Sequence, residues 1–250
     1  MLTVRIIPCL DVEDGQVVKG IRFKDIRRAG DPAELAHFYN QQKADEIIFL
    51  DIGATYRSRK IMIDVVEKVS QSVFVPLTVG GGIRSVQDMR DLLNAGADKV
   101  AVCSAALEHP QILKEGKEMF GSQCVVLSVD AQRVNHSWHA FVKGGREDTG
   151  KDVLEWAQEG EALGAGEILL NSIDMDGTRG GYDLELTRKV SGQASIPVIA
   201  SGGAGNLFQI WEAVEKGKAD AVLMASLLHY KEFTIYQIKQ YLKEKGVPVR

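Results

Sequence analysis

The stretches PLTVGGGIRSVQDMRDLLNAGADKV (Pro76–Val100) and PVIASGGAGNLFQIWEAVEKGKADAV (Pro197–Val222) decide the fold of this chain. Each contains a short apolar strand, a glycine-rich turn and an amphipathic helix that leads to another strand. Gly81-Gly82 in the first copy aligns with Gly202-Gly203 in the second. The copies start 121 residues apart, which is about half of the 250-residue chain. A repeat of this length predicts a duplicated block of several strand–helix units.

The repeat continues outside these stretches. Further pairs at equivalent places are Asp98 with Asp220, Ser104 with Ser226, Glu46 with Glu167, and Asp11 with Asp130. Strand–helix units resemble one another in general, but matched glycines and acids at strand ends exceed that background. We therefore expect two duplicated half-barrels, roughly residues 1–121 and 122–250, within one domain.

Eight apolar or β-branched runs alternate with amphipathic segments along the chain. Near-continuous apolar strands are typical of a parallel sheet covered by helices on its outer face. An example of the intervening helices is Pro32–Gln42, with Asp31 as its N-cap. Eight such units in 250 residues favour a single (βα)8 TIM barrel of the α/β class over an open sheet. The expected strands are Val4–Leu10, Glu46–Leu50, Val75–Val79, Lys99–Val102, Val125–Val129, Glu167–Asn171, Val198–Ala200 and Ala221–Met224.

Composition excludes several classes of protein. The 30 basic and 34 acidic residues are interspersed, so the sequence shows no nucleic-acid or membrane-surface patch. No window approaches the roughly 18 apolar residues of a membrane span, and the start MLTVRIIPCLDV reads as a strand and not as a signal peptide. Cys9, Cys103 and Cys124 are an odd number without metal-ligand spacing, which indicates a reducing compartment. We expect a cytoplasmic protein without a bound metal.

Barrel enzymes carry their active site at the C-terminal ends of the strands. Glycine-rich turns at Gly80–Gly82 and Ser201–Gly203 end two of the expected strands, and Ser104 and Ser226 follow the next ones. Free backbone N–H groups and hydroxyls at helix N-termini bind anions. A single glycine turn is weak support, because glycine also closes turns that bind nothing. The duplicated pair predicts two phosphate sites on opposite sides of the barrel mouth, and hence a substrate with a phosphate at each end.

Asp11 and Asp130 end equivalent strands of the two halves. Two facing carboxylates can act as acid and base when one is held protonated and the other ionised. The alternative is that each aspartate merely caps the loop that follows it. We favour catalysis because the pair is symmetric. After the first strand, Lys19 and the basic stretch Gly20–Gly30 suggest a long loop, either an active-site lid or a solvated surface.

Four charged residues stand at strand starts, and so at the opposite end of the barrel: Arg5, Glu46, Lys99 and Glu167. Alternating charges that point into the bore would form a closed ring of ion pairs. Buried ions are costly unless they are fully paired. On physical grounds alone, a structural role is the simpler interpretation of this ring.

Motifs across the chain resemble one known family, the cyclase subunit of imidazole glycerol phosphate synthase. The resemblance covers Arg5 to Arg250. A sister isomerase of histidine biosynthesis shares single motifs, whereas the combination is typical of the cyclase. The motifs are RIIPCLDVEDGQVVKG, RRAGDP, IIFLDI, PLTVGGGIRSVQD, GADKV, GAGEILLNSIDMDGTRGGYD and IASGGAG.

The resemblance implies an ammonia-using lyase of histidine biosynthesis. Ammonia attacks a bis-phosphorylated phosphoribulosyl-formimino-aminoimidazole-carboxamide ribotide, which splits into imidazole glycerol phosphate and aminoimidazole-carboxamide ribotide. Asp11 would be the general base, Asp130 the general acid and Asp176 an assisting group, and Lys19 would hold the substrate. The implied substrate and phosphate contacts are Gly82, Cys103, Ser104, Asn171, Gly177, Gly203, Ala225 and Ser226.

The resemblance also changes the interpretation of the charged ring. It implies that Arg5, Glu46, Lys99 and Glu167 form a gate for ammonia, which a separate glutaminase subunit docked on that face supplies. Asp98 would contact that partner. No cofactor is implied.

The chain departs from the family pattern at three places. Cys103-Ser104 stands where Asn-Thr is usual, Gly53 where Thr or Ser is commoner, and Lys143-Gly144-Gly145 replaces a hydroxyl-bearing loop. These departures leave open a paralogue that passes ammonia to an amidino-sugar precursor. The sister ribotide isomerase and a non-catalytic activator of a glutaminase are further alternatives.

Overall fold

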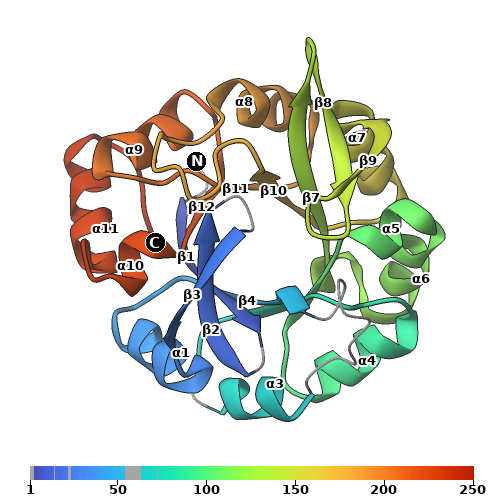
Figure 1. Cartoon of the computed structure of the whole chain (residues 1–250), viewed down its shortest axis with the longest axis horizontal. Coiled ribbons are helices and arrows are strands. Elements are labelled where there is room, and N and C mark those ends of the chain that lie inside the picture. Colours follow the sequence, from blue (N-terminus) through green and yellow to red (C-terminus); the bar gives the residue numbers. More distant parts are fainter. Residues whose placement is uncertain (1–2, 14, 22–23, 54–62, 72) are drawn as a thin grey trace.

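Parallel strands close into a barrel, and helices form a ring around it (Figure 1). The computed structural model describes residues 3–13, 15–21, 24–53, 63–71 and 73–250, and leaves the side chains of 19–21 and 24–29 undescribed. Each barrel strand pairs in parallel with its neighbour, and the ring is closed where Val125–Val134 pairs with Glu167–Ser172 and Ala221–Met224 with Arg5–Glu13. This confirms the predicted (βα)8 barrel. Its strands are β1 (Arg5–Glu13), β4 (Ile47–Asp51), β5 (Leu77–Gly80), β6 (Lys99–Val102), β7 (Val125–Val134), β10 (Glu167–Ser172), β11 (Val198–Ser201) and β12 (Ala221–Met224).

Alternation along each strand separates two apolar clusters. On β1, Ile6 and Leu10 belong to the large cluster between the strands and the helices. Ile7 and Cys9 belong to a smaller cluster that fills the bore. Because side chains alternate between the two faces of a strand, Arg5 and Asp11 share the inward face with Ile7 and Cys9. The inward-facing residues of β1 therefore place a charge at each end of the bore, Arg5 at one end and Asp11 at the other.

The helices follow the strands as expected. The predicted helix Pro32–Gln42 is α1 (Pro32–Gln41), and the carboxylate of its N-cap Asp31 accepts hydrogen bonds from the backbone of Ala33 and Glu34. No helix in the described part of the chain is long and apolar enough to cross a membrane. The other helices are α3 (Ile63–Ser70), α4 (Val86–Asn94), α5 (Ser104–Glu108), α6 (Gln111–Phe120), η1 (Ser122–Cys124), α7 (Val153–Leu163), α8 (Leu184–Gln193), α9 (Leu207–Glu215), α10 (Ser226–His229) and α11 (Ile235–Glu244).

The prediction of a long loop after the first strand was wrong. Strand β1 continues past the barrel rim to Glu13, and the chain returns as a hairpin of β2 (Gln16–Ile21) and β3 (Lys24–Gly30). The charges of this stretch suggested a loop, whereas backbone pairing of β2 with β1 and with β3 makes it a hairpin.

A second hairpin, unforeseen from the sequence, follows β7. Strand β7 extends to Val134 and pairs with β8 (Ser137–Val142), which in turn pairs with β9 (Glu147–Asp152). The two hairpins follow β1 and β7, and Figure 1 shows the β7–β8 hairpin projecting past the ring of helices, with β9 beside α7.

Candidate active site

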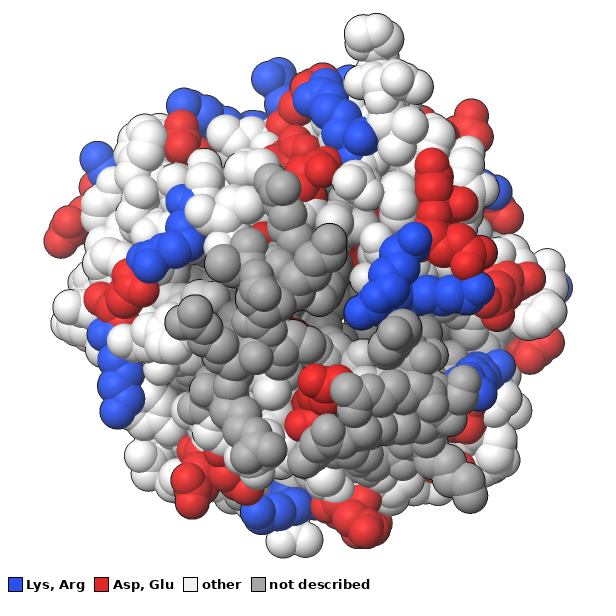
Figure 2. Space-filling model, viewed as in Figure 1, with Lys and Arg blue, Asp and Glu red and all other residues white. Residues whose placement is uncertain are grey.

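A cavity of about 180 Å³ opens at the C-terminal ends of the barrel strands. Gly82 is not among its lining residues, although its neighbour Gly81 is, and the side chain of Lys19 lies outside the described part of the structure. On the face seen in Figure 2, Lys and Arg side chains alternate with Asp and Glu around the rim. The predicted residues that line the cavity are Asp11, Cys103, Ser104, Asp130, Asn171, Asp176, Gly177, Gly203, Ala225 and Ser226.

Asp11 and Asp130 reach this cavity from opposite strands. Three strands separate β1 from β7 in each direction around the ring, so the two carboxylates stand across the mouth from each other. The thiol of Cys9 lies 3.1 Å from Oδ1 of Asp11. The sequence could predict this opposition because it depends only on strand order and parity.

The Asp130 carboxyl is held by two donors. Nδ2 of Asn171 donates to its Oδ1 at 3.0 Å, and Sγ of Cys103 lies 3.9 Å from its Oδ2. Burial raises the pKa of Asp130 to about 6, the Asn171 hydrogen bond works against this rise, and the negative charges of Asp176 and Asp11 add to it. A carboxyl with this pKa can hold or release a proton near neutral pH.

Asp176 approaches from the segment after β10. Its side chain is buried, and its backbone N–H donates to the carbonyl of Ser172 at 2.9 Å. This tight turn directs the segment Asp176–Gly177 back over the barrel mouth. The third predicted carboxylate therefore lines the same cavity as Asp11 and Asp130.

The two glycine-rich turns have matching backbones. Gly81 and Gly202 have φ of 97° and 93°, and each follows the last residue of its strand, in a region that side chains rarely adopt. A Cβ on Gly81 would lie 2.2 Å from the carbonyl oxygen of Asp51, and one on Gly203 would lie 2.0 Å from that of Gly181. Glycine is therefore required at both turns by close backbone approach.

The serines of the two halves also occupy matching positions. Ser104 and Ser226 are the first residues of the short helices α5 and α10. The preceding residues, Cys103 and Ala225, have similar backbone angles and make no side-chain capping bond to the helix. Short helices after barrel strands are common phosphate-binding elements. The hydroxyl of Ser104 also accepts a hydrogen bond from the backbone N–H of Lys143 at 3.2 Å.

Some cavity residues were missed by sequence reasoning. Arg146 lies in the β8–β9 turn, and Arg179 follows Gly177 on the segment after β10. Asp51 was recognisable as a strand-end acid, whereas Arg146 gave no signal because its hairpin was not expected. Further lining residues outside the predicted set include Glu13, Ser128 and Gly144.

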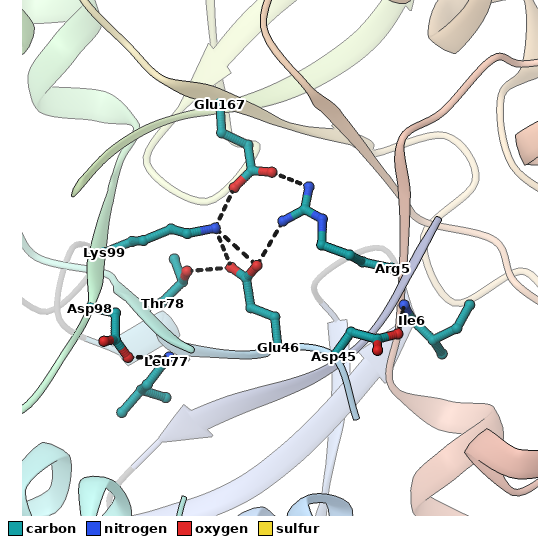
Figure 3. A network of polar contacts seen from close by, with 9 residues as sticks. All are labelled: Arg5, Ile6, Asp45, Glu46, Leu77, Thr78, Asp98, Lys99 and Glu167. Carbon is teal, nitrogen blue, oxygen red and sulfur yellow. Dashed lines mark hydrogen bonds and ion pairs between the residues drawn. The ribbon is translucent and has the colours of Figure 1, made fainter. Parts of the chain in front are cut away.

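At the other end of the bore, the four predicted charges form a closed ring (Figure 3). Arg5 pairs with Glu46 at 2.7 Å and also with Glu167. Lys99 pairs with Glu46 at 2.9 Å and with Glu167 at 2.8 Å. Thr78 donates a further hydrogen bond to Glu46 at 2.6 Å, so this buried carboxylate is fully satisfied.

Asp98 lies beside this ring. Its Oδ2 accepts a hydrogen bond from the backbone N–H of Leu77 at 2.8 Å, while the residue as a whole is exposed. Asp220 makes the equivalent bond to Val198 at 2.9 Å in the second half. Asp98 thus anchors a strand start and presents an exposed carboxylate at the floor of the barrel.

The fold and the cavity define an enzyme of the (βα)8-barrel class, with paired carboxylates at the mouth and a charged ring at the floor. A family model described as histidine biosynthesis protein matches residues 5–234. The chain belongs to this family.

Curated relatives narrow the membership further. The protein named imidazole glycerol phosphate synthase subunit HisF from Clostridium botulinum (strain Langeland) is 55% identical over 252 residues that cover all of both chains. Proteins of the same name from Geobacillus kaustophilus and Dehalococcoides mccartyi are each 56% identical, over all of this chain and 100% and 99% of their own lengths. These relatives confirm the predicted resemblance to the cyclase subunit, and with it an enzyme of histidine biosynthesis.

Proposed function

We propose that this chain uses ammonia to convert phosphoribulosyl-formimino-aminoimidazole-carboxamide ribotide into imidazole glycerol phosphate and aminoimidazole-carboxamide ribotide. One observation carries the proposal: Asp11 and Asp130, from matching strands of the two halves, line a single cavity between two glycine-rich turns. An elongated substrate with a phosphate at each end would place its centre between the two acids.

The two aspartates have different tasks in this proposal. Asp130, with a pKa raised to about 6 by burial, acts as the general acid and gives a proton to the departing group. Asp11 acts as the general base. Asp176 assists because its negative charge helps to raise the pKa of Asp130. A proton donor and a proton acceptor on opposite sides of one substrate allow ring closure and bond cleavage without a cofactor.

The phosphates would bind in the duplicated turns. One site combines the turn at Gly82 with Cys103 and Ser104, and the other combines Gly177 and Gly203 with Ala225 and Ser226. Lys19 on β2 would hold the substrate. Backbone N–H groups of the turns, exposed where glycine allows positive φ, supply donors for the phosphate oxygens.

Ammonia would enter from the floor. The ring of Arg5, Glu46, Lys99 and Glu167 closes the end of the bore that lies opposite the cavity, on the same inward faces of the strands. We place a glutaminase subunit on this floor as the source of ammonia, with Asp98 as one of its contacts. Such a ring would have no task in a ribotide isomerase, which needs no ammonia.

The reaction would take place in the cytoplasm. No disulfide joins Cys9, Cys103 or Cys124, which supports a reducing compartment. A disulfide-free barrel of this size obtains its stability from its two apolar clusters.

A direct assay tests the proposal. The purified chain is incubated with the ribulosyl substrate, with and without ammonium salt, and both products are quantified. We expect product formation only when ammonia is present, and expect glutamine to replace ammonium only after the glutaminase is added. Isomerisation without ammonia would refute the proposal.

A further inference from the structure

The two halves of the barrel differ next to their catalytic aspartates. In the second half, Asp130 is in register with Asn171, and Asn171 with Ser201. In the first half, Asp11 is in register with Leu50, and Leu50 with Gly80. By register, Asn171 and Leu50 therefore occupy equivalent positions in the two halves, and so do Ser201 and Gly80.

Three side chains of the second half form a hydrogen-bonded chain. The hydroxyl of Ser201 donates to Oδ1 of Asn171 at 3.0 Å, and Nδ2 of Asn171 donates to Oδ1 of Asp130 at 3.0 Å. Because an ionised carboxylate can only accept, Asp130 takes the Nδ2 end of the carboxamide, and the Ser201 hydroxyl then donates to the Oδ1 end and holds the amide in place. The amide is thus held in the orientation that donates to Asp130.

The first half fills the same space with hydrocarbon. Leu50 belongs to the apolar packing of the bore and lines the cavity. A Cβ on Gly80 would lie 2.9 Å from Cδ2 of Leu50, so the leucine occupies the place that a serine side chain takes in the other half. The pseudo-twofold symmetry of the barrel is therefore broken at these two register positions.

We propose that Asn171, oriented by Ser201, is a positioning residue that fixes the Asp130 carboxyl for proton transfer and sets the task of Asp130 apart from that of Asp11. This inference rests on the proposed cyclase function. The family resemblance implies that Asn171 also contacts the substrate, but the positioning role acts through its hydrogen bond to Asp130.

The surroundings of Asp130 and the amide of Asn171 have opposite effects on the pKa of this carboxyl. The Asn171 bond stabilises the ionised carboxylate, whereas burial and the charges of Asp176 and Asp11 destabilise it. Cys103 adds a weak contact, and burial raises the pKa of its thiol, so it remains a neutral donor. Loss of the amide should therefore raise the pKa of Asp130. The charged or titratable side chains lining the cavity are Asp11, Glu13, Asp51, Cys9, Cys103, Arg146, Asp176 and Arg179.

The decisive variant is Asn171→Leu, which installs the residue of the first half at the matching position. We expect the carboxyl signal of Asp130, followed by carbon NMR of labelled protein, to titrate about one pH unit higher than in the wild type. We expect kcat with ammonium to fall roughly 10- to 100-fold, with KM changed less than about threefold, because the phosphate turns at both ends of the substrate are unchanged. The alkaline limb of the kcat profile should move upward with the carboxyl titration.

Two further variants separate positioning from general damage. Ser172→Ala alters the next residue of the same strand, whose buried hydroxyl has no hydrogen-bond partner among the described residues, and it should leave titration and kcat unchanged. Ser201→Ala leaves the donor on Asn171 but releases its acceptor end, so we expect a smaller change in the same direction. Circular dichroism and thermal unfolding establish that each variant is folded.

The outcomes distinguish this inference from the function on which it rests. If a folded Asn171→Leu variant keeps the wild-type titration of Asp130 and its kcat, the positioning role is wrong while the cyclase function stands. If the wild type shows no ammonia-dependent turnover, the proposed function fails, and the NMR titration still reports whether Asn171 controls the Asp130 carboxyl. An equal effect of Ser172→Ala would also overturn the positioning role.

Discussion

Asp130, the proposed general acid, lies in an environment that favours its neutral form. Its pKa is raised to about 6, chiefly by burial and also by Asp176 and Asp11, so a fraction of the molecules carries the proton near neutral pH. No sequence pattern gives this value, because burial depends on how the strand ends converge. The sequence identified the residue, and the packing around it determines its pKa.

The first prediction concerns the acid pair. Asp11→Asn and Asp130→Asn should each lower kcat with ammonium by about a hundredfold or more, because each removes one partner of proton transfer. The substrate should still bind, since the phosphate turns are untouched, and calorimetric titration can measure this. Turnover retained in both variants would contradict the assignment.

The second prediction concerns pH and stability. The pKa of Asp130 is higher in the folded state than in the unfolded chain, so the folded state binds more protons between about pH 4 and 6, and stability falls across that window as pH rises. Asp130→Asn removes this loss. The free energy of unfolding of the variant should exceed that of the wild type by up to about 3 kcal/mol at pH 8, and the two should be equal below pH 4. Urea denaturation at both pH values measures the difference, and an equal gain at both would contradict it.

At the level of elements, the glycine turns are the most constrained parts of the mouth. The structure shows why Gly203 cannot carry a side chain: its φ is 96°, and a Cβ would lie 2.0 Å from the carbonyl oxygen of Gly181. The sequence repeat predicted the turn, but only the fold shows which segment presses against it.

The third prediction uses a pair of glycine variants. Gly203→Ala should destabilise the protein by about 2 kcal/mol or more and weaken substrate binding, because the backbone must move. Gly192→Ala is the matched control, since Gly192 lies in α8 and a Cβ added there would meet no atom within 4 Å. This helical change should stabilise by roughly 0.5–1 kcal/mol. Thermal unfolding of both variants tests the contrast, and similar losses would contradict it.

Hairpins were the elements that sequence reasoning handled least well. β2–β3 was expected as a loop, and β8–β9 was not expected at all. β9 is polar throughout, and β8 mixes polar residues with buried apolar ones such as Trp138, so neither has the near-continuous apolar run that identified the barrel strands. Arg146 was missed for the same reason.

On the scale of the whole molecule, the charged ring is the feature with the largest expected cost if it is broken. Glu46 is buried and is bonded to Arg5, Lys99 and Thr78, while Glu167 completes the ring from the other half. Removal of one partner from such a set leaves the half-buried cations Arg5 and Lys99 without full compensation.

The fourth prediction concerns Glu46→Gln. We expect a loss of about 3 kcal/mol in unfolding free energy, against less than about 0.5 kcal/mol for Glu215→Gln, whose ion pair with Lys218 is exposed. In the complex, glutamine-driven turnover should fall more than ammonium-driven turnover, because ammonium can reach the mouth from solvent. Equal loss in both assays would remove the ring from the ammonia route.

We also propose that the halves 1–121 and 122–250 arose by duplication of a four-unit ancestor. Support comes from the equal register of Asp11 with Leu50 and of Asp130 with Asn171. The paired hairpins after β1 and β7 support it as well.

By itself, the sequence determined the strand order, the parity that directs Asp11, Asp130 and the four floor charges into the bore, and the duplicated turns. These are periodic or repeated features, and local chemistry fixes them. Tertiary structure alone decided the pKa of Asp130, the Ser201–Asn171 chain that orients it, and the place of Arg146 in the cavity. Each of these depends on which residues from distant segments come into contact, and burial and hydrogen bonding act only once the barrel has closed.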